Sequence, residues 1–293
     1  MALSLFRRRS VDIRAMRATR AIAGRVSSGI RREGRWAPRA VDIPDERFVP
    51  ALFGAWAVRV ADAAGLGPGD HVLDVACGTG ALSAEAARRV EPGGAVTGLD
   101  CNNGRLAAAK RQWGNIEWRL GKPESLPFEA RGFDAAVSQF GLTFFADRVW
   151  ALHEMWRVLR PGGRLAVAVW DRIAANAGYE ALATLVEDLF GNRIAGELRA
   201  PFALGDRETL RTGFAAAGIG QVEIGTAKET ARFRSLMSWI EIETREWTLA
   251  GLIDDEQSKT LLAQVPRALR KFVRADGSVA FQSSAHIVTA AKM

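Results

Sequence analysis

A short apolar run, VLDVACGTG at residues 72–80, stops at an acid and turns through two glycines. Asp74, Ala76, Gly78 and Gly80 stand at alternate positions of a predicted strand-to-helix turn. The absence of Cβ atoms on the glycines lets the backbone approach a ligand closely. A second predicted strand ends at Asp100, in the run VTGLD. A carboxylate there can accept hydrogen bonds from both hydroxyls of a ribose. The two features together predict a nucleoside-binding site.

The spacing of the glycines indicates which nucleoside is bound. A dinucleotide fold requires G-x-G-x-x-G, but Ser83 stands where the third glycine would be. The acid before the turn, Asp74, disfavours a pyrophosphate and favours a ligand that carries fixed positive charge, such as an ammonium or a sulfonium. S-adenosylmethionine meets both requirements.

Five ordered motifs between residues 45 and 171 agree with this interpretation: VLDVACGTG, VTGLD, ESLPF, FDAAVSQFGLTFF and ALHEMWRVLRPGGRLAVAVW. On these motifs the chain resembles the class I S-adenosylmethionine-dependent methyltransferases, within them the group that includes the ubiquinone and menaquinone biosynthesis C-methyltransferases. The resemblance implies an enzyme that transfers a methyl group and uses S-adenosylmethionine as its cofactor.

The resemblance also implies roles for single residues. The methionine portion of the cofactor is expected against the first turn, which consists of Asp74, Ala76, Cys77, Gly78, Thr79 and Gly80. Asp100 is expected to bind the ribose, with Cys101 and Asn102 beside the adenine. Gln139 and Phe140, at the end of the fourth strand, are expected to close the pocket.

One stretch departs from the family pattern, in which Gly-Asp-Ala precedes the LPF element. This chain has Gly121, Lys122 and Pro123 there. The carboxylate that accepts from the adenine amine is therefore missing, and Pro123 offers no backbone N–H. Glu124 is close enough in sequence to replace that acceptor. Without such a replacement, the affinity for the cofactor is expected to be weaker. The alternative is that stacking and Asp100 hold the adenine.

Strands and helices alternate from residue 41 onward, which is the pattern of a parallel sheet covered on both faces. Strands are predicted at 71–76, 95–100, 116–120, 133–140 and 164–171, and helices at 81–90, 105–113 and 146–159. The predicted fold class is α/β, a doubly wound Rossmann-like sheet with its ligand site outside the carboxyl ends of the strands. Two further strands are expected at 221–232 and 286–291, and the resemblance implies that the last of the seven runs antiparallel.

Residues 234–275 are expected to form a helical lid over the methyl acceptor. The run SLMSWIEIETREWTLAGLI places Leu236, Glu243 and Trp247 on one helical face, with Trp239 or Ile240 between them. A second helix is predicted at 255–273. Trp239 and Trp247 are candidate substrate contacts, and the alternative is that this aromatic stripe belongs to the core.

Nothing in the sequence specifies a catalytic base. Methyl transfer from a sulfonium is an in-line displacement that needs a base only when the acceptor carries a proton of high pKa. His286 would begin an antiparallel last strand at the carboxyl edge of the sheet, and Asp171 would end the fifth strand at the same edge. Both are therefore candidate catalytic residues, and the alternative for His286 is a packing role.

Charge divides the chain into a leader, residues 1–40, and a methyltransferase domain, residues 41–293. The leader holds eleven Arg and no Lys against Asp12 and Glu33, a formal +9, whereas the rest of the +7 chain carries −2. We interpret the leader as a disordered tail, and the alternatives are a mitochondrial transit peptide or an arm that touches anionic partners. A folded part without net positive charge does not favour nucleic acid as a partner.

The same sequence predicts where the protein works and what it lacks. No apolar run approaches the roughly 18 residues of a membrane-spanning helix, and no secretory signal is present. Cys77 and Cys101 lack metal-ligand spacing. We therefore expect a cytoplasmic protein without a metal ion, with the mitochondrial matrix as the alternative location.

The absence of certain motifs reduces the range of possible methyl acceptors. No N-P-P-Y or D-P-P-Y stretch follows the fourth strand, which disfavours methylation of nucleobase amino groups. No Pro-Cys nucleophile is present, which disfavours methylation of pyrimidine C5. A small apolar or aromatic molecule is the expected acceptor. Two other functions stay open: a non-catalytic relative used for assembly or binding, and an RNA or protein methyltransferase recruited by the basic leader.

Overall fold

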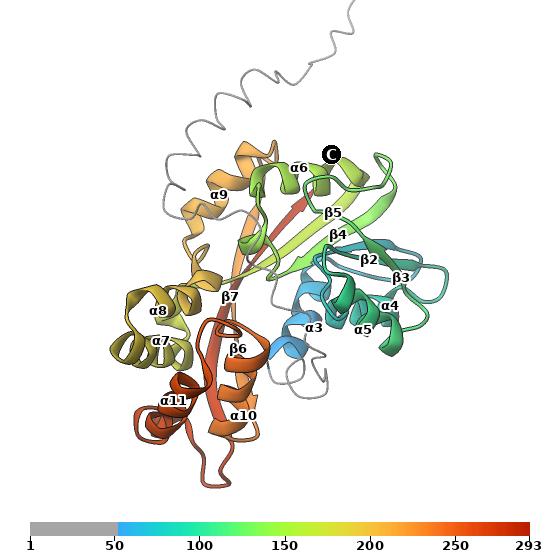
Figure 1. The fold of residues 1–293 in the computed structure, drawn as a ribbon. Coiled ribbons are helices and arrows are strands. Elements are labelled where there is room, and N and C mark those ends of the chain that lie inside the picture. Colours follow the sequence, from blue (N-terminus) through green and yellow to red (C-terminus); the bar gives the residue numbers. More distant parts are fainter. Residues whose placement is uncertain (1–51) are drawn as a thin grey trace, which may run out of the picture. The chain divides into compact units, whose positions relative to one another are not determined.

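The computed structural model describes residues 52–293, which form a seven-stranded sheet in the order β3-β2-β1-β4-β5-β7-β6 (Figure 1). Strands β1 to β5 run parallel, and β7 pairs antiparallel with both β5 and β6. The predicted doubly wound sheet is confirmed. The strands are β1 His71–Val75, β2 Ala95–Asp100, β3 Glu117–Leu120, β4 Phe133–Gln139, β5 Leu159–Trp170, β6 Glu223–Phe233 and β7 Val279–Ala291.

Two strands are longer than the sequence predicts. β5 begins at Leu159 rather than residue 164, because the Gly162 N–H donates to the Lys292 carbonyl at 2.6 Å and the Lys292 N–H donates to the Gly163 carbonyl at 2.8 Å. β7 begins at Val279 rather than residue 286, because it pairs with β6 along that strand's whole length, from Glu223 to Phe233.

One face of the sheet is covered by a large hydrophobic core, to which helices from the beginning, middle and end of the described chain contribute. The helices are α3 Gly54–Ala63, α4 Ala81–Val90, α7 Ala177–Phe190, α8 Asn192–Arg199, α10 Leu236–Glu241 and α11 Asp255–Ala268. In α4, Leu82, Ala86 and Val90 recur every fourth residue and are buried, so the helix presents one apolar stripe to the sheet. Trp56 of α3 is fully buried in the same core.

The opposite face carries a second core beneath α6 Arg148–Val158 and α9 Arg207–Ala216. Leu152 and Met155 of α6 and Phe214 of α9 are buried there. The Asp147 carboxylate caps α6 by accepting from the Trp150 N–H, which satisfies one of the free amides of the first turn. Figure 1 shows α6 and α9 near the end of the long strands where the C-terminus lies, and α10 and α11 near their opposite end.

The order of the strands fixes where a ligand can bind. β1 lies between β2 and β4, with Leu73 beside Ala136 and Asp74 beside Val137, so the chain reverses its direction of winding at β1. A doubly wound sheet binds ligands at this switch point, outside the carboxyl ends of the strands. Helix α5, Asn103–Gln112, follows β2 at that edge.

Residues 236–272 connect β6 to β7 and are largely helical. After α10 the chain continues as a π-helix, η5 Ile242–Glu246, and after α11 it makes a 3-10 turn, η6 Arg270–Phe272. Three other 3-10 turns, η2 Leu142–Phe144, η3 Ile173–Ala175 and η4 Ala200–Phe202, join the elements nearer the sheet. The proposed role of this insertion as a lid stays a prediction.

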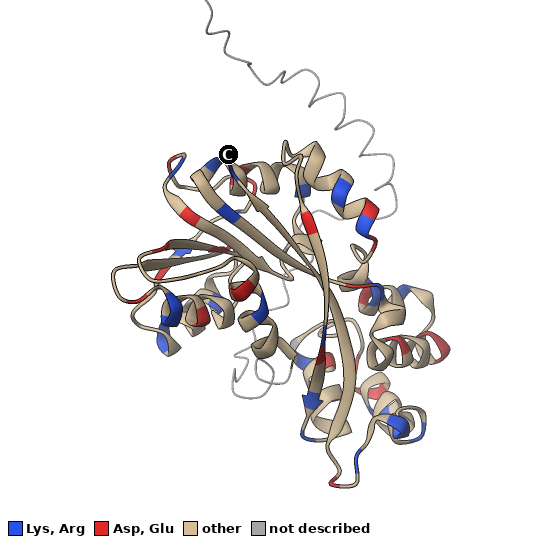
Figure 2. Cartoon of the chain, turned by 180° about the vertical axis from the view of Figure 1, so that it is seen from behind, with Lys and Arg blue, Asp and Glu red and all other residues tan. Residues whose placement is uncertain are grey.

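Charged side chains of both signs are interspersed on the helices of the described residues, and most sheet positions are uncharged (Figure 2). Within residues 52–293 no helix is both long and apolar enough to cross a membrane. The predicted leader, residues 1–40, lies outside the residues that the structure describes.

Candidate active site

Asp74 lies near the end of β1, and both Asp74 and its hydrogen-bond partner Ser83 are buried. Its Oδ2 accepts from the Ser83 hydroxyl of α4 at 2.6 Å, whereas its Oδ1 has no hydrogen-bond partner among the described residues. Burial raises the pKa of this carboxyl from 3.8 to about 7, and the charge of Asp100 adds to the rise. A cation placed beside Oδ1 would favour the ionised form, so Asp74 is arranged to receive a positively charged group.

Gly78 and Gly80 shape the turn for different reasons. Gly78 has φ +58° and a Cβ there would meet no described atom within 4 Å, so this backbone borders open space. Gly80 has φ +94°, and a Cβ there would lie 2.6 Å from Cη2 of Trp118 and 3.0 Å from Cδ1 of Trp113. An indole ring of β3 occupies the side on which a Gly80 side chain would lie, so packing alone requires a glycine here, and a ligand contact of Gly80 stays a prediction.

Trp118 had no role in the sequence analysis. Its ring packs into the core on the face of α4 and would clash with a side chain at Gly98 as well as at Gly80. Its Nε1 donates to the Trp113 carbonyl at 3.1 Å, which fixes the ring. The signal in the sequence was a large aromatic residue between Glu117 and Arg119 on an edge strand.

Asp100 ends β2 beside this turn. Its Oδ2 accepts from the Gly78 N–H at 2.9 Å and its Oδ1 from the Asn102 N–H at 2.8 Å. The cap of α5 is Asn102, whose side chain accepts from the Arg105 N–H at 3.1 Å. A carboxylate has about four acceptor positions, so Asp100 orders the first turn and keeps capacity for two ribose hydroxyls. Neighbouring Cys101 is exposed.

Gln139 and Phe140 lie at the end of β4. Phe140 has φ +60° and its ring stacks on Trp170, with centroids 3.7 Å apart. Gln139 donates through Nε2 to the Phe53 carbonyl at 3.0 Å, and its buried Oε1 finds no partner in residues 52–293. Ala76, at the end of β1, also has φ +60°. Two non-glycine residues with left-handed backbone therefore sit at adjacent strand ends, and such strain is typical of functional sites.

Glu124 does not hold its Oε1 free. That oxygen accepts from the Ala146 N–H at 2.8 Å and from the Asp147 N–H at 3.3 Å. The segment before it makes a tight turn, in which the Ser125 N–H donates to the Lys122 carbonyl at 3.1 Å. A role for Glu124 toward adenine would have to use its second oxygen.

These residues fit the cofactor that the sequence predicts. The orphaned Oδ1 of Asp74 suits the ammonium or sulfonium of S-adenosylmethionine, the open space at Gly78 suits its methionine portion, and the spare acceptor capacity of Asp100 suits its ribose. Thr79 and Cys77 belong to the same turn, half-buried and buried respectively.

Aromatic rings extend from the end of β4 into the helical insertion. Phe53 lies 5.8 Å from Phe140 and 5.9 Å from Trp247 between ring centroids. Trp56 meets both Phe140 and Trp170 edge-on at 5.9 Å. We call these five residues the aromatic wall. Trp56, Phe140 and Trp170 are buried and Phe53 and Trp247 are half-buried, so the wall is a packed apolar region beside the end of β4.

Trp239 and Trp247 lie differently in this region. Trp239 is fully buried and stacks on Phe233 at 5.4 Å, which agrees with a core role. Trp247 belongs to the aromatic wall and also meets Tyr179 edge-on at 5.9 Å. Trp247 is therefore the better placed of the two candidate substrate contacts.

A buried carboxylate beside the wall was not predicted as a site residue. Glu243 of η5 is 0% exposed, and its Oε1 accepts from the Tyr179 hydroxyl of α7 at 2.9 Å and from Nε1 of Trp239 at 3.4 Å. Its Oε2 accepts from the Thr248 hydroxyl. The signal in the sequence was an acid on the apolar face of the predicted lid helix.

The structure brings His286 and Asp171 together. Nε2 of His286 lies 3.2 Å from Oδ1 of Asp171 and 3.2 Å from the Gly205 carbonyl, so these two acceptors indicate that this nitrogen carries the proton. Nδ1 then accepts from the Thr226 hydroxyl at 2.8 Å. The ring is buried on the α9 side of the sheet, whereas the aromatic wall is on the other side. This placement favours the packing role over contact with an acceptor.

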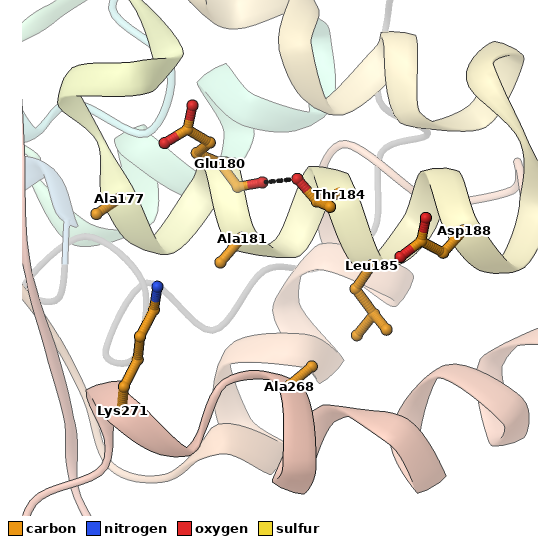
Figure 3. Close-up of a pocket in the computed structure, with 8 residues that line it drawn as sticks. All are labelled: Ala177, Glu180, Ala181, Thr184, Leu185, Asp188, Ala268 and Lys271. Atoms are coloured by element: carbon orange, nitrogen blue, oxygen red, sulfur yellow. Dashed lines mark hydrogen bonds between the residues drawn. The ribbon is translucent and has the colours of Figure 1, made fainter.

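An open groove of about 420 Å³ lies between α7 and the end of α11 (Figure 3). Glu180, Thr184 and Asp188 line it from α7, and Lys271 faces them from η6. None of its lining residues comes from β1, β2 or β4, so it is separate from the cofactor turn. Within residues 52–293 no group of three or more His, Cys, Asp or Glu side chains is placed to hold a metal ion.

Comparison with known proteins shows which family this chain resembles. Residues 72–163 match the family described as "Methyltransferase domain". The chain is 38% identical to demethylmenaquinone methyltransferase of Beutenbergia cavernae over 130 residues, 44% of this chain and only 53% of that protein. It is 31% identical to the ubiquinone/menaquinone biosynthesis C-methyltransferase UbiE of Hahella chejuensis over 194 residues, 61% of this chain and 78% of that protein.

The fold is also found in solved structures. A candidate methyltransferase from an antibiotic biosynthesis pathway of Anabaena variabilis superposes with a TM-score of 0.59 at 15% identity, covering 80% of this chain and 96% of its own. At that identity the likeness concerns the fold alone. With the match to UbiE, the chain belongs to the UbiE-like group of class I methyltransferases, and it is an enzyme that uses S-adenosylmethionine as its cofactor.

Proposed function

We propose that this methyltransferase acts on a small hydroxylated aromatic acceptor of the hydroquinone type and methylates a ring carbon. The observation that carries the proposal is the aromatic wall, in which the Phe140 and Trp170 rings stack at 3.7 Å beside the cofactor turn. Offset and edge-on ring contacts of this kind bind flat aromatic molecules. The names of its relatives, which act in quinone biosynthesis, support the same acceptor class.

The cofactor site is part of the proposal. Bound S-adenosylmethionine supplies a methyl group on a positively charged sulfur. Asp74 and the open side of Gly78 would hold its cationic methionine portion, and Asp100 its ribose. The remaining contacts are proposed for Ala76, Cys77, Thr79, Gly80, Cys101, Asn102, Glu124, Gln139 and Phe140, with Gly80 acting through its backbone.

The proposal also covers the helical insertion and the location of the protein in the cell. Residues 234–275, with Trp247 reaching the aromatic wall, would cover the acceptor and keep water out. A cytoplasmic location is proposed, with the mitochondrial matrix as the alternative if the basic leader directs import.

A direct assay tests the acceptor. The full chain is incubated with S-adenosylmethionine and 1,4-naphthalenediol kept reduced, beside naphthalene, bulk tRNA and a mixed peptide pool as alternative acceptors. We expect the diol to gain one methyl group on a ring carbon, located by NMR, and naphthalene to gain none. Methylation of tRNA or peptide with no product from the diol would overturn the proposal.

A further inference from the structure

Glu243 and Tyr179 form a buried acid pair that joins the insertion to the sheet. Tyr179 is the single tyrosine of the chain and is 2% exposed at the start of α7. Its hydroxyl donates to Oε1 of Glu243 at 2.9 Å. Glu243 lies in the π-helix η5, and single π-turns are frequent at functional sites. The methyl-transfer site described so far uses neither side chain.

The pair is connected to the aromatic wall through two routes of ring contacts. On one route Tyr179 meets Trp247 at 5.9 Å, and Trp247 meets Phe53 of the aromatic wall at 5.9 Å. On the other, Tyr179 meets Phe202 at 5.5 Å, and Phe202 meets Trp170 at 6.1 Å. Trp247 therefore joins Tyr179 directly to the aromatic wall, and the ring of Trp247 or Phe202 separates Tyr179 from the other wall residues.

The direction of the hydrogen bond determines what Tyr179 can do. Its O–H donates to a carboxylate, and the Trp239 indole also interacts with its oxygen. One lone pair of that oxygen remains to accept from another hydroxyl, and the charge on the carboxylate strengthens this acceptor. We propose that Tyr179 is a catalytic residue that takes the hydroxyl proton of a phenolic acceptor and at the same time passes its own proton to Glu243. This inference rests on the hydroquinone-type acceptor proposed above.

The atoms and charges balance in this scheme. The acceptor O–H bond breaks, a new O–H bond forms on Tyr179, and the former Tyr179 proton bonds to Glu243. The ring carbon, made electron-rich by the phenolate, takes the methyl group, and the ring proton then moves to the phenolic oxygen. One proton stays on Glu243, and the positive charge of the cofactor sulfur is lost together with the negative charge of the carboxylate.

The protonation chemistry suits this role. Burial raises the pKa of Glu243 from 4.5 to about 7, close to the pH at which a general base works best. Burial also raises the pKa of Tyr179 well above 10, so the tyrosine stays neutral and relays the proton. The groups that face the carboxylate are the Tyr179 hydroxyl from α7, the Trp239 indole from α10 and the Thr248 hydroxyl after η5.

The scheme requires the acceptor hydroxyl to reach the Tyr179 oxygen, so the ring of Trp247 or Phe202 must yield as the acceptor enters. Both rings belong to short elements, the end of η5 and the 3-10 turn η4. A purely structural tie between α7 and η5 is the competing explanation. It predicts a loss of stability on substitution but no change in how the rate depends on pH.

Two variants separate these explanations. Tyr179→Phe keeps the ring and removes the hydroxyl, and Glu243→Gln keeps the shape and removes the base. Matched controls are Thr184→Ala on α7, which removes the hydroxyl bonded to the Glu180 carbonyl, and Glu241→Gln, a partly exposed carboxylate of α10. Each protein is assayed from pH 5.5 to pH 9 (roughly the range around the Glu243 titration) with S-adenosylmethionine and 1,4-naphthalenediol, and its melting temperature and affinity for S-adenosylhomocysteine are measured.

We expect both variants to lower kcat about 100-fold at neutral pH, the usual size of a general-base contribution. Their affinity for S-adenosylhomocysteine should stay within about twofold, and the rise of kcat with pH through the Glu243 pKa should disappear. The controls should behave like the parent. Tyr179→Phe is informative on its own if Glu243→Gln does not fold.

Two results would overturn the relay, and they differ. If the parent methylates the diol and both variants keep its kcat and pH profile, the relay is wrong and the proposed acceptor stands. If the parent does not methylate the diol at all, the acceptor class is wrong and the relay that rests on it falls as well.

Discussion

Gly78 and Gly80 are two residues apart and have left-handed backbone in common, but their surroundings differ. A side chain at Gly80 would enter the Trp118 ring, and one at Gly78 would enter open space beside Asp74 and Asp100. The first glycine of the pair is therefore the one proposed to serve the ligand, whereas the second allows the Trp118 ring to pack against the start of α4.

This difference predicts that the same substitution acts mainly on stability at Gly80 and mainly on ligand binding at Gly78. Gly80→Ala should lower the free energy of unfolding by about 2 kcal/mol, because a strained backbone and a clash with Trp118 combine. Gly78→Ala should cost about 1 kcal/mol for its left-handed backbone alone, yet weaken S-adenosylhomocysteine binding at least tenfold (roughly 1.4 kcal/mol). Urea unfolding and calorimetric titration measure the two quantities.

Trp118→Leu provides the control. Adding it to Gly80→Ala should recover much of the lost stability, since it removes the ring that the new methyl group meets. If Gly80→Ala costs as much in that background as in the parent, the clash is not the reason for Gly80.

At the scale of elements, Glu243 ties η5 to α7 through the Tyr179 hydroxyl and to the following segment through Thr248. A carboxyl whose folded pKa is about 7 and whose ordinary pKa is 4.5 holds its proton more tightly in the folded protein. Its favourable contribution is complete below pH 4.5 and is lost as the pH rises to about 7.

The free energy of unfolding should therefore fall more steeply with pH in the parent than in Glu243→Gln. The difference should reach about 3 kcal/mol between the acidic and alkaline ends of this window, from the size of the shift. Urea unfolding at a series of pH values measures it. Glu241→Gln should follow the parent, and a Glu243→Gln curve parallel to the parent's would contradict the raised pKa.

Local patterns predicted the central elements well. The ranges 81–90 and 95–100 coincide with α4 and β2, because a Gly-Gly or Glu-Pro-Gly boundary and an apolar period are local properties of the chain. The early starts of β5 and β7 were not predictable in this way. They depend on pairing with Lys292 and with β6, which are distant in sequence.

The same limit applies to the site. Asp74, Gly78 and Asp100 follow strand ends, and the topology that brings those ends together could be read from the sequence. The burial of Glu243 against Tyr179, 64 residues apart, could not, since no local pattern relates a residue after β5 to one in the insertion. The engagement of Glu124 with the start of α6 is of the same kind.

For the molecule as a whole, the proposed active site has three parts. The β1 turn and Asp100 form the proposed cofactor site, the aromatic wall follows at β4 and β5, and the insertion contributes Trp247 and Glu243. The central claim is that Asp100 binds the ribose of the cofactor, although it also bonds the Gly78 and Asn102 amides.

Because of those two amides, a simple loss of affinity in an Asp100 variant would not separate a bond to the ribose from a distorted turn. The two explanations can be separated by comparing the affinities for two ligands that differ only in the ribose hydroxyl. The ligands are S-adenosylhomocysteine and its 2′-deoxy analogue, and the proteins are the parent, Asp100→Asn and Asp206→Ala. The last removes the cap of α9, which lies away from the cofactor turn.

The decisive measurement is the ratio of the two dissociation constants, by calorimetric titration, for each protein. A hydrogen bond to a charged acceptor contributes about 1.5 to 3 kcal/mol, so the parent and Asp206→Ala should bind the deoxy analogue at least tenfold more weakly (about 1.4 kcal/mol). In Asp100→Asn the preference should shrink to a few-fold, because the bond to a neutral amide oxygen is weaker. An equal ratio in all three proteins would contradict the account, and Asp100 would then serve only to order the turn.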